Sequence, residues 1–413
     1  MIMNKEMYVN RRDKALKSLE PGQAVLIFAN PQPGGIYHFI QEKNFLYFTG
    51  LNLPNAILIM ANWGKTSSSF LFIDRNIPEM IVWEGEKMHK EEATELSGIE
   101  SVFYLDEFER IISGYAVSLK TVYTHSFQIA LGNPLTRAAM WIQQLRTHFP
   151  HLSFDGLGKV VTPLRSVKEP WELEQMQKAI DITGQGIRKI MDNSQVGMME
   201  YALESMLYHE MLSNGYRHWG FRPIIAGGHN ATTLHYEDND CVVEKDVLVL
   251  LDVGASCNGY SADITRTYPI AKKFKKRQLD VYKAVLETQE TVIGMIKPGV
   301  SMTELNETAV KILTKAMLKL KLITDEKDFR RYYMHSIGHH LGLDTHDVGA
   351  RDSVLEVGNV ITVEPGIYIP EESLGVRIED DILVTETGYR NLSINIPKAP
   401  KALEEIRAAA LAK

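Results

Sequence analysis

Cysteine is scarce in this chain, since only two of its 413 residues are cysteines. Cys241 and Cys257 show neither the spacing of a thiolate zinc site nor that of a disulfide framework. A fold held together by disulfides is therefore excluded, and a reducing compartment is the expected environment.

Long hydrophobic runs and an excess of basic residues are also missing. No uninterrupted apolar stretch approaches the roughly 20 residues that cross a membrane, and the beginning of the chain is charged where a secretory signal would be apolar. The 45 basic and 52 acidic residues give a net charge of -7, which disfavours phosphate-rich nucleic acid as a partner. We expect a soluble, cytoplasmic protein that binds neither membranes nor nucleic acid.

Three common catalytic motifs are absent from the sequence. There is no GxSxG turn for a serine nucleophile. The word HSIGH has the histidine spacing of a zinc-binding helix but lacks its glutamate, and Gly338 disfavours a helix there. The word GLGKVV lacks the third glycine of a dinucleotide loop. None of these three chemistries is therefore indicated.

Chain length and a hydrophobic content of 45% suit two domains, each with its own core. In the first part of the chain, strand-like runs such as QAVLIFAN, NAILIM, SSFLFID and SVFYL alternate with helix-like stretches. This alternation predicts an α/β domain with a mixed or parallel sheet. We place the two domains at 1–160 and 165–413, because glycines there give way to a helix that begins at Pro170.

The second domain is expected to combine helices and strands, which puts the whole chain in the α/β (α+β) class. Two of its helices are expected near 278–295 and 303–320. The helix that begins at Pro170 has an apolar face formed by Leu173, Met176, Ile180, Ile187 and Ile190.

Five side chains in the second domain have the donor chemistry of a metal site. They are Asp252, Asp263, His339, Glu364 and Glu379. Asp252 closes the apolar run VLVLLDVGA, and Asp263 follows the turn-forming segment SCNGY. Two strands joined by this turn would bring both carboxylates together. Glu364 and Glu379 likewise interrupt β-branched, apolar runs.

A buried carboxylate without a partner is too costly to keep, so a cation is the simplest explanation for this set. Each acid taken singly could equally be a salt-bridged or capping residue. Four carboxylates and one imidazole suit two divalent cations that share a site. Oxygen-rich ligation favours manganese, cobalt, iron or a catalytic zinc over a structural zinc.

Four segments of the sequence together resemble the pita-bread metallopeptidases, and within them the aminopeptidase P family. They are LLDVGASCNGYSADITRTYP, HSIGHHLGLDTHDVG, ITVEPGIYI and GVRIEDDILVTETG. RRDKALKSLEPGQAVLIFAN and NFLYFTGLNLPNAILIM resemble that family's N-terminal domain, so the likeness covers nearly the whole chain. Methionine aminopeptidase lacks such a domain and fits poorly. Prolidase has both parts and stays an alternative.

The resemblance implies an N-terminal aminopeptidase P-type domain followed by a pita-bread catalytic domain. It also implies that the five residues named above hold two metal ions, usually manganese, with one Asp and Glu379 as bridging ligands. Two cations about 3.5 to 4 Å apart can hold a hydroxide and polarise a scissile carbonyl. Glu364 is the candidate proton shuttle, although it could be a ligand and nothing more.

The family pattern also assigns roles to residues that are not ligands. His335 is expected to donate a hydrogen bond to the oxyanion, and His235 and His346 to grip the substrate near its proline. Arg377, two residues before Glu379 and on the same side of a strand, could hold substrate oxygens or orient a ligand carboxylate.

Some residues in or beside these segments are expected to have no direct role in hydrolysis. His340 is assigned none, and Asp380 and Asp381 are expected behind the ligands or in solvent. The segment PEESL is shorter than its counterpart in the longer aminopeptidase P enzymes, which leaves the substrate rim undefined.

The expected activity is release of the N-terminal residue from peptides with proline in second position. An Xaa-Pro bond lacks the N–H that ordinary peptidases dock, so a dedicated enzyme is useful. The alternatives are a prolidase, which cleaves Xaa-Pro dipeptides, and a pita-bread binding protein or metal-free hydrolase like creatinase. The family resemblance also implies a homo-oligomer, a dimer or a tetramer.

Overall fold

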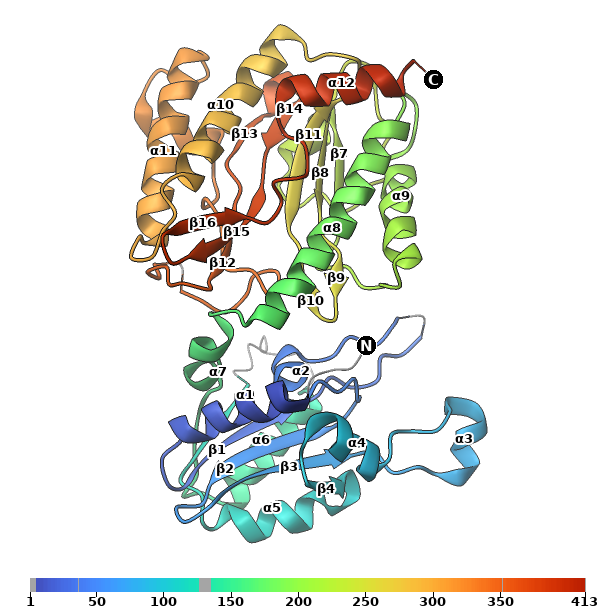
Figure 1. Ribbon diagram of the computed structural model, residues 1–413, viewed down its shortest axis with the longest axis vertical. Helices are drawn as coiled ribbons and strands as arrows, with labels where there is room; N and C mark the ends of the chain where they lie inside the picture. The colour runs from blue at the N-terminus through green and yellow to red at the C-terminus, as the bar shows by residue number, and fades with distance from the viewer. Residues whose placement is uncertain (1–4, 36, 126–134, 351, 413) are drawn as a thin grey trace. The chain divides into compact units, whose positions relative to one another are not determined.

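The computed structural model divides the chain into two compact units, Met1–Leu164 and Arg165–Lys413 (Figure 1). This division lies within a few residues of the boundary expected from the sequence. The residues that the structure describes are 5–35, 37–125, 135–350 and 352–412.

The N-terminal unit is built on a six-stranded sheet with the strand order β4-β3-β2-β1-β5-β6. The strands are β1 (Gln23–Phe28), β2 (Ile57–Asn62), β3 (Ser67–Ile73), β4 (Ser101–Tyr104), β5 (Thr121–Thr124) and β6 (Ser153–Gly156). The pairs β1–β2 and β2–β3 are antiparallel, and the other three pairs are parallel. The predicted α/β domain therefore has a mixed sheet.

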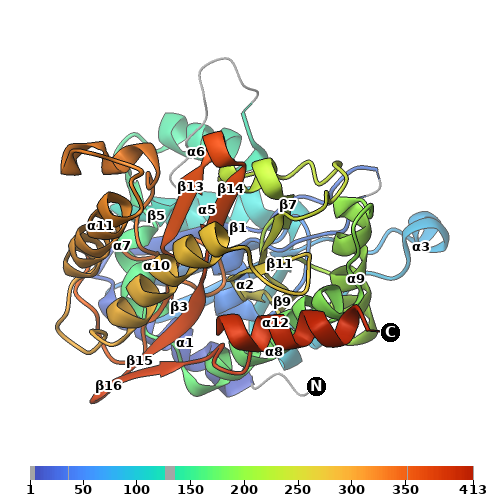
Figure 2. The ribbon, with the colours of Figure 1, turned by 90° about the horizontal axis from the view of Figure 1, so that it is seen from above.

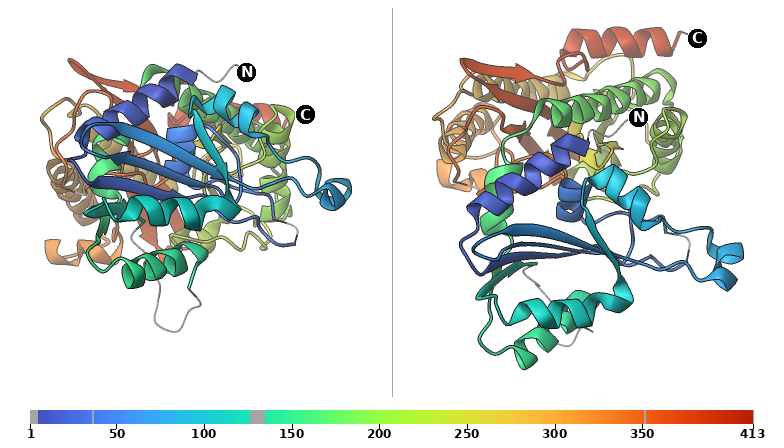
Figure 3. Two further views of the ribbon diagram at one scale, coloured as in Figure 1. Left: turned by 90° about the horizontal axis from the view of Figure 1, so that it is seen from below. Right: turned by 60° about the horizontal axis from the view of Figure 1, so that its bottom comes forward.

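Helices cover both faces of this sheet (Figure 3). The helices of this unit are α1 (Lys5–Ser18), α2 (Lys43–Thr49), α3 (Pro78–Glu84), α4 (Lys90–Ser97), α5 (Phe108–Ala116), α6 (Arg137–His148) and α7 (Gly158–Arg165). Helices α1 and α4 lie on one face, and α5 and α6 lie on the other. Alternate residues of each strand point to opposite faces, so both layers receive apolar side chains.

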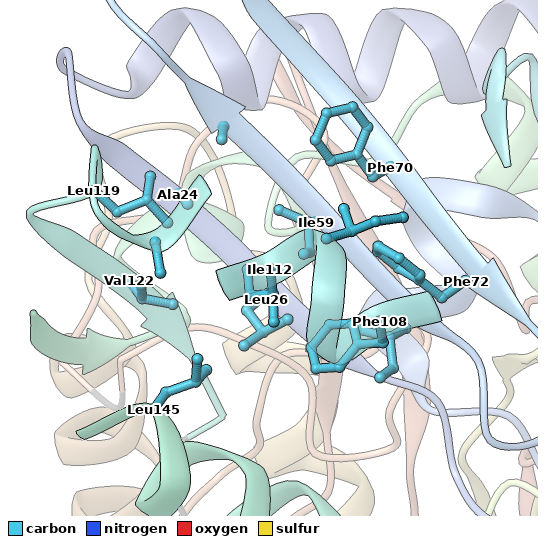
Figure 4. Close-up of a cluster of buried hydrophobic side chains, with 14 of the residues drawn as sticks. Ala24, Leu26, Ile59, Phe70, Phe72, Phe108, Ile112, Leu119, Val122 and Leu145 are labelled. Carbon is cyan, nitrogen blue, oxygen red and sulfur yellow. The ribbon is translucent and has the colours of Figure 1, made fainter. Parts of the chain in front are cut away.

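The core between the sheet and α5 is rich in aromatic rings (Figure 4). Phe108 of α5 points toward Phe72 and Leu26 of the sheet. Its ring lies 5.1 Å from that of Phe72 and 4.9 Å from that of Trp141, edge to face in both cases. Such packing stabilises beyond the area that it buries.

The C-terminal unit has strands between two pairs of helices, α8 and α9 on one side and α10 and α11 on the other (Figure 1). Its helices are α8 (Pro170–Asn193), α9 (Glu200–Ser213), α10 (Lys276–Ile293), α11 (Met302–Lys319) and α12 (Pro400–Ala410). Its strands are β7 (Ile224–Gly227), β8 (Leu248–Val253), β9 (Ser256–Cys257), β10 (Tyr260–Ser261), β11 (Ile264–Pro269), β12 (Val360–Val363), β13 (Gly366–Ile369), β14 (Leu374–Arg377), β15 (Asp380–Thr385) and β16 (Gly388–Asn391).

These strands form small antiparallel sheets with the orders β11-β8-β7, β12-β15-β16, β13-β14 and β10-β9. Helix α12 packs against α8 at the outside of the unit (Figure 2). The helices expected from the apolar periodicity correspond to α8, α10 and α11. Among the described residues, no helix is long and apolar enough to cross a membrane.

Two local expectations need correction. The residues just before the boundary form a short helix, α7, which the sequence analysis did not predict and which contains Pro163. Glu379 does not lie on a strand, because β14 ends at Arg377 and β15 begins at Asp380. The side chains of Arg377 and Glu379 nevertheless point the same way, as predicted, because both bond the hydroxyl of Thr265.

We expect Phe108→Ala to destabilise the N-terminal unit by about 3 to 5 kcal/mol, because it leaves a cavity among aromatic rings. Hydrogen exchange in urea should show faster opening of β1, β2 and α5, with β8 and β11 unchanged. Val82→Ala is the control, because Val82 is 82% exposed. Equal effects of the two substitutions would contradict this placement of the core.

Candidate metal centre

Two antiparallel strands present the first two candidate ligands. Asp252 lies in β8 opposite Thr265 of β11, and Asp263 directly precedes β11. The chain between them makes a small hairpin, β9–β10, whose turn residues Asn258 and Gly259 have φ values of 51° and 90°. Asn-Gly suits such a turn because both residues tolerate positive φ. The single turn expected from the sequence is thus an inserted hairpin that still returns Asp263 to Asp252.

His339 lies in an extended segment that runs beside β12. Its backbone exchanges hydrogen bonds with Thr362, through Thr362 Oγ1 at 3.1 Å and Thr362 N at 2.9 Å. A Cβ on Gly338 would lie 2.0 Å from the Thr362 carbonyl oxygen, so this close approach requires glycine. His339 Nδ1 donates to the His340 carbonyl oxygen at 3.0 Å, which leaves Nε2 to bind a metal.

The two glutamates follow strand ends. Glu364 comes directly after β12, and its backbone N–H donates to the Ile337 carbonyl oxygen at 2.8 Å. Glu379 lies between β14 and β15 and is 1% exposed. Its Oε2 accepts a hydrogen bond from Thr265 Oγ1 at 2.6 Å, which holds the carboxylate against β11.

These elements bring the predicted ligands to one cavity of about 740 Å³. His339 Nε2 lies 3.4 Å from Asp263 Oδ2 and 3.5 Å from Glu364 Oε1. Candidate donor atoms of Asp263, His339 and Glu379 lie within 4.8 Å of one another. The cavity is also lined by Asp252, Glu364, His235, His335, His346 and Arg377. All predicted site residues therefore line the same cavity.

The electrostatics of this cluster suit a bound cation. Burial, together with the nearby acids, raises the pKa of Asp263 to about 7 and that of Glu379 well above its ordinary value. Burial opposes charge on His339, but Asp263 and Glu364 outweigh it and raise the pKa of His339 to about 9. Asp252 Oδ1 is buried and has no hydrogen-bond partner among the described residues. An orphaned carboxylate oxygen beside crowded acids is what a divalent cation would satisfy.

Arg377 is buried beside this cluster, with 4% of the residue exposed, and it bonds three side chains there. Its Nη2 pairs with Asp252 Oδ2 at 2.5 Å, and its Nε donates to Thr265 Oγ1 at 3.2 Å. Its Nη1 donates to the Tyr368 hydroxyl at 2.9 Å. Of the two roles considered for Arg377, these contacts favour the orientation of a ligand carboxylate.

A hydrogen-bonded chain continues from Arg377 through Tyr368 to His335. The Tyr368 hydroxyl lies 2.8 Å from His335 Nε2, and His335 Nδ1 donates to the Ser336 carbonyl oxygen at 2.8 Å. Burial lowers the pKa of His335 despite the nearby Glu364. A neutral His335 with its proton on Nδ1 therefore accepts from Tyr368.

The other histidines occupy different positions. His235 and His346 are exposed at the cavity, and the His346 ring lies 4.3 Å from that of His339, edge to face. His340 is buried, and its Nε2 lies 2.8 Å from Ser353 Oγ. Its carbonyl oxygen accepts from His339 Nδ1 and so fixes the His339 tautomer.

Sequence reasoning missed two residues that orient the site, Thr265 and Tyr368. Thr265 lies opposite Asp252 in the sheet, so strand register could have found it. Tyr368 lies in the segment ITVEPGIYI. No role was predicted for it, because tyrosine is not a usual ligand for these metals. Their shared signal is proximity to Arg377, which is visible only in the fold.

The fold and the site together define a metallopeptidase. Residues 174–386 match the sequence profile of metallopeptidase family M24, and residues 8–123 match the aminopeptidase P N-terminal domain. The chain therefore belongs to metallopeptidase family M24, whose members bind divalent metal. The match at 8–123 also confirms the predicted front domain, which methionine aminopeptidase lacks.

Characterised relatives match over the full length of the chain. The Xaa-Pro aminopeptidase of Escherichia coli K12 is 32% identical over 439 aligned residues, covering 99% of each chain. The structure of E. coli aminopeptidase P with the inhibitor Pro-Leu superimposes with a TM-score of 0.91, 31% identity and full coverage of both chains. A zinc-substituted, product-bound form gives a TM-score of 0.89, 31% identity and 99% coverage of each chain. The predicted family and fold class are confirmed.

We expect Glu379→Gln to weaken Mn²⁺ binding about 100-fold or more and to reduce the number of ions bound, because the amide loses the negative charge of the carboxylate. Titration calorimetry on the metal-depleted protein measures both quantities. Glu386→Gln, an exposed acid seven residues further on, is the matched control. Indistinguishable titrations of the two variants would show that Glu379 is not a ligand.

Proposed function

We propose that this chain is an Xaa-Pro aminopeptidase that uses two divalent metal ions, with manganese as the preferred metal and cobalt, iron or zinc as alternatives. The observation that carries the proposal is the convergence of four carboxylates and one imidazole on one cavity, in a chain whose two domains both match this family. The proposed ligands are Asp252, Asp263, His339, Glu364 and Glu379.

The two cations, when bound, would lower the pKa of a water molecule and polarise the scissile carbonyl. Glu364 is assigned the proton transfer, from the water to the nitrogen of the leaving peptide. Its position supports this role, because its side chain is 18% exposed to the cavity, whereas Glu379 is buried. Glu364 can thus be a ligand and still reach the substrate.

His335 is assigned the hydrogen bond to the oxyanion of the tetrahedral intermediate. Its Nε2 bonds the Tyr368 hydroxyl, so the substrate oxygen would replace that hydroxyl as its partner. Because Nδ1 already donates to the Ser336 carbonyl oxygen, this exchange requires a second proton, on Nε2, when substrate is bound. Arg377 orients Asp252 and Tyr368 rather than binding substrate directly.

His235 and His346 are assigned to the substrate itself. Both are exposed at the cavity, which places them where a peptide enters, whereas the ligands lie deeper. An Xaa-Pro bond offers no N–H, so its recognition depends on side chains that contact the ring and the carbonyl oxygens. Homo-oligomerisation and a cytoplasmic location stay predictions.

We expect the manganese-loaded protein to release the first residue from Xaa-Pro-Yaa tripeptides, and chelation to abolish this activity. Mass spectrometry of the products, with Xaa-Pro dipeptides and a Met-Ala-Yaa peptide in parallel, measures the preference. Cleavage of dipeptides alone would replace the proposal with a prolidase. Absence of metal-dependent cleavage would favour a non-peptidase member of the fold.

We expect Tyr368→Phe to lower kcat on tripeptides about 10- to 100-fold, because Arg377 and His335 both lose a partner. Metal binding should change less than about twofold, since Tyr368 contacts no ligand side chain directly. Tyr389→Phe, on the exposed strand β16, is the control. An unchanged kcat would remove Tyr368 from the mechanism, and a loss of metal would make it a structural support.

A further inference from the structure

A buried ion cluster outside the ligand set lies beside His346. Asp347 has 1% of its side chain exposed, and both of its carboxylate oxygens are paired. Oδ1 accepts from Arg165 Nη2 at 2.5 Å, and Oδ2 accepts from Lys168 Nζ at 3.0 Å. The two cations are equally buried, with 2% and 1% of their side chains exposed. Three buried charges therefore meet at one point of the cavity wall.

The contacts of Arg165 span the residues that precede Asp347. Its Nη2 also bonds Asp344 Oδ2 at 2.7 Å, so one nitrogen joins both ends of the segment Asp344–Asp347. Thr345 Oγ1 donates to the carbonyl oxygen of Gly220, which also lines the cavity, at 3.0 Å. His346 is therefore the most exposed residue of a segment that Arg165 and Gly220 hold in place.

Backbone contacts hold both partners of this cluster in place. The Asp347 N–H donates to the His340 carbonyl oxygen at 2.9 Å, and the Lys168 N–H donates to the Gly358 carbonyl oxygen at 2.9 Å. A Cβ on Gly342 would lie 2.1 Å from Asp347 Oδ2 and 2.9 Å from the Lys168 side chain. A larger residue at position 342 would therefore have to displace the paired side chains of Asp347 and Lys168.

Burial of three charges is an inefficient way to gain stability, because desolvation offsets much of their attraction. Burial alone would raise the pKa of Asp347, but Lys168 and Arg165 outweigh burial and hold this pKa below its ordinary value. What a fully paired cluster does supply is a fixed geometry. The neighbour that would benefit is His346, since its ring packs against the ligand His339.

We propose that Arg165, Lys168 and Asp347 are positioning residues that hold the His346 ring at the cavity, and through it the proline side of the substrate. The substrate part of this inference rests on the function proposed above. The placement of the ring does not, so the two can be tested separately.

The test uses the double variant Lys168→Met/Asp347→Asn, which removes one charge of each sign. We expect its crystal structure to show the His346 ring displaced by about 1 Å or more, or without a single position, with the metal ligands unmoved. A His346 ring in its original place would overturn the positioning role. This result does not depend on which peptide the protein cleaves.

Kinetics then test whether the displacement matters to the substrate. We expect the double variant to lower kcat/KM on Xaa-Pro-Yaa tripeptides about 10- to 100-fold, mainly through KM, with the number of bound Mn²⁺ ions unchanged. In a His346→Ala background the same double substitution should change kcat/KM less than about twofold. An equal loss in both backgrounds would mean a general structural role and overturn the inference. A wild-type protein inactive on these peptides would overturn the proposed function, while the crystal structure still decides the placement.

Two further variants distinguish a specific effect on His346 from a general loss of folded structure. Arg165→Lys keeps every charge but replaces the planar guanidinium that joins Asp344 to Asp347, so we expect a smaller rise in KM and a smaller ring displacement. Glu210→Gln is the matched control, because it breaks an ion pair with Lys189 between α8 and α9, away from the cavity. If this control raised KM as much as Arg165→Lys, the effect would not be specific to His346.

Discussion

Close burial of like charges is the constraint on which the rest of this structure depends. Asp263 and Glu379 are almost fully buried, and burial together with neighbouring acids raises the pKa of both. Acids this close would normally be separated or neutralised. The C-terminal unit instead holds them together, because each is bonded to a backbone or side chain that cannot easily move: the Asp381 carboxylate holds the Asp263 backbone, and Thr265 holds the Glu379 side chain.

Two adjacent buried acids of the C-terminal unit differ in how their charge is compensated. Asp380 and Asp381 are neighbours and both are buried, yet their pKa values shift in opposite directions. Burial would raise the pKa of Asp380, but Arg266 and Lys398 lower it below the ordinary value. For Asp381, burial and the nearby Asp263 raise the pKa well above the ordinary value. Of these two neighbours, Asp380 is thus compensated by cations of the protein, whereas Asp381 faces Asp263 of the candidate site.

The sequence indicated the candidate ligands because each acid interrupts an apolar run, and such an interruption can be read from the sequence alone. It could not indicate Arg165 as the partner of Asp347, since 182 positions separate them and only the fold brings them together. The same applies to Tyr368, whose hydroxyl joins Arg377 to His335. Strand ends were hard to place for a related reason: hydrogen-bond register, not composition, ends β14 at Arg377.

Charge balance supports the proposed pair of metal ions over a single ion. The cavity holds the carboxylates of Asp252, Asp263, Glu364 and Glu379, and Arg377 is the one guanidinium paired with them among the described residues. If His339 binds as a neutral ligand, as proposed, three negative charges in the cavity have no compensating cation among the described residues. One divalent cation would leave the cavity negative, which would repel the electron-rich carbonyl oxygen of a peptide. Two divalent cations exceed the three charges by one, and this surplus favours an anionic nucleophile and the negative charge that develops on the substrate oxygen during hydrolysis.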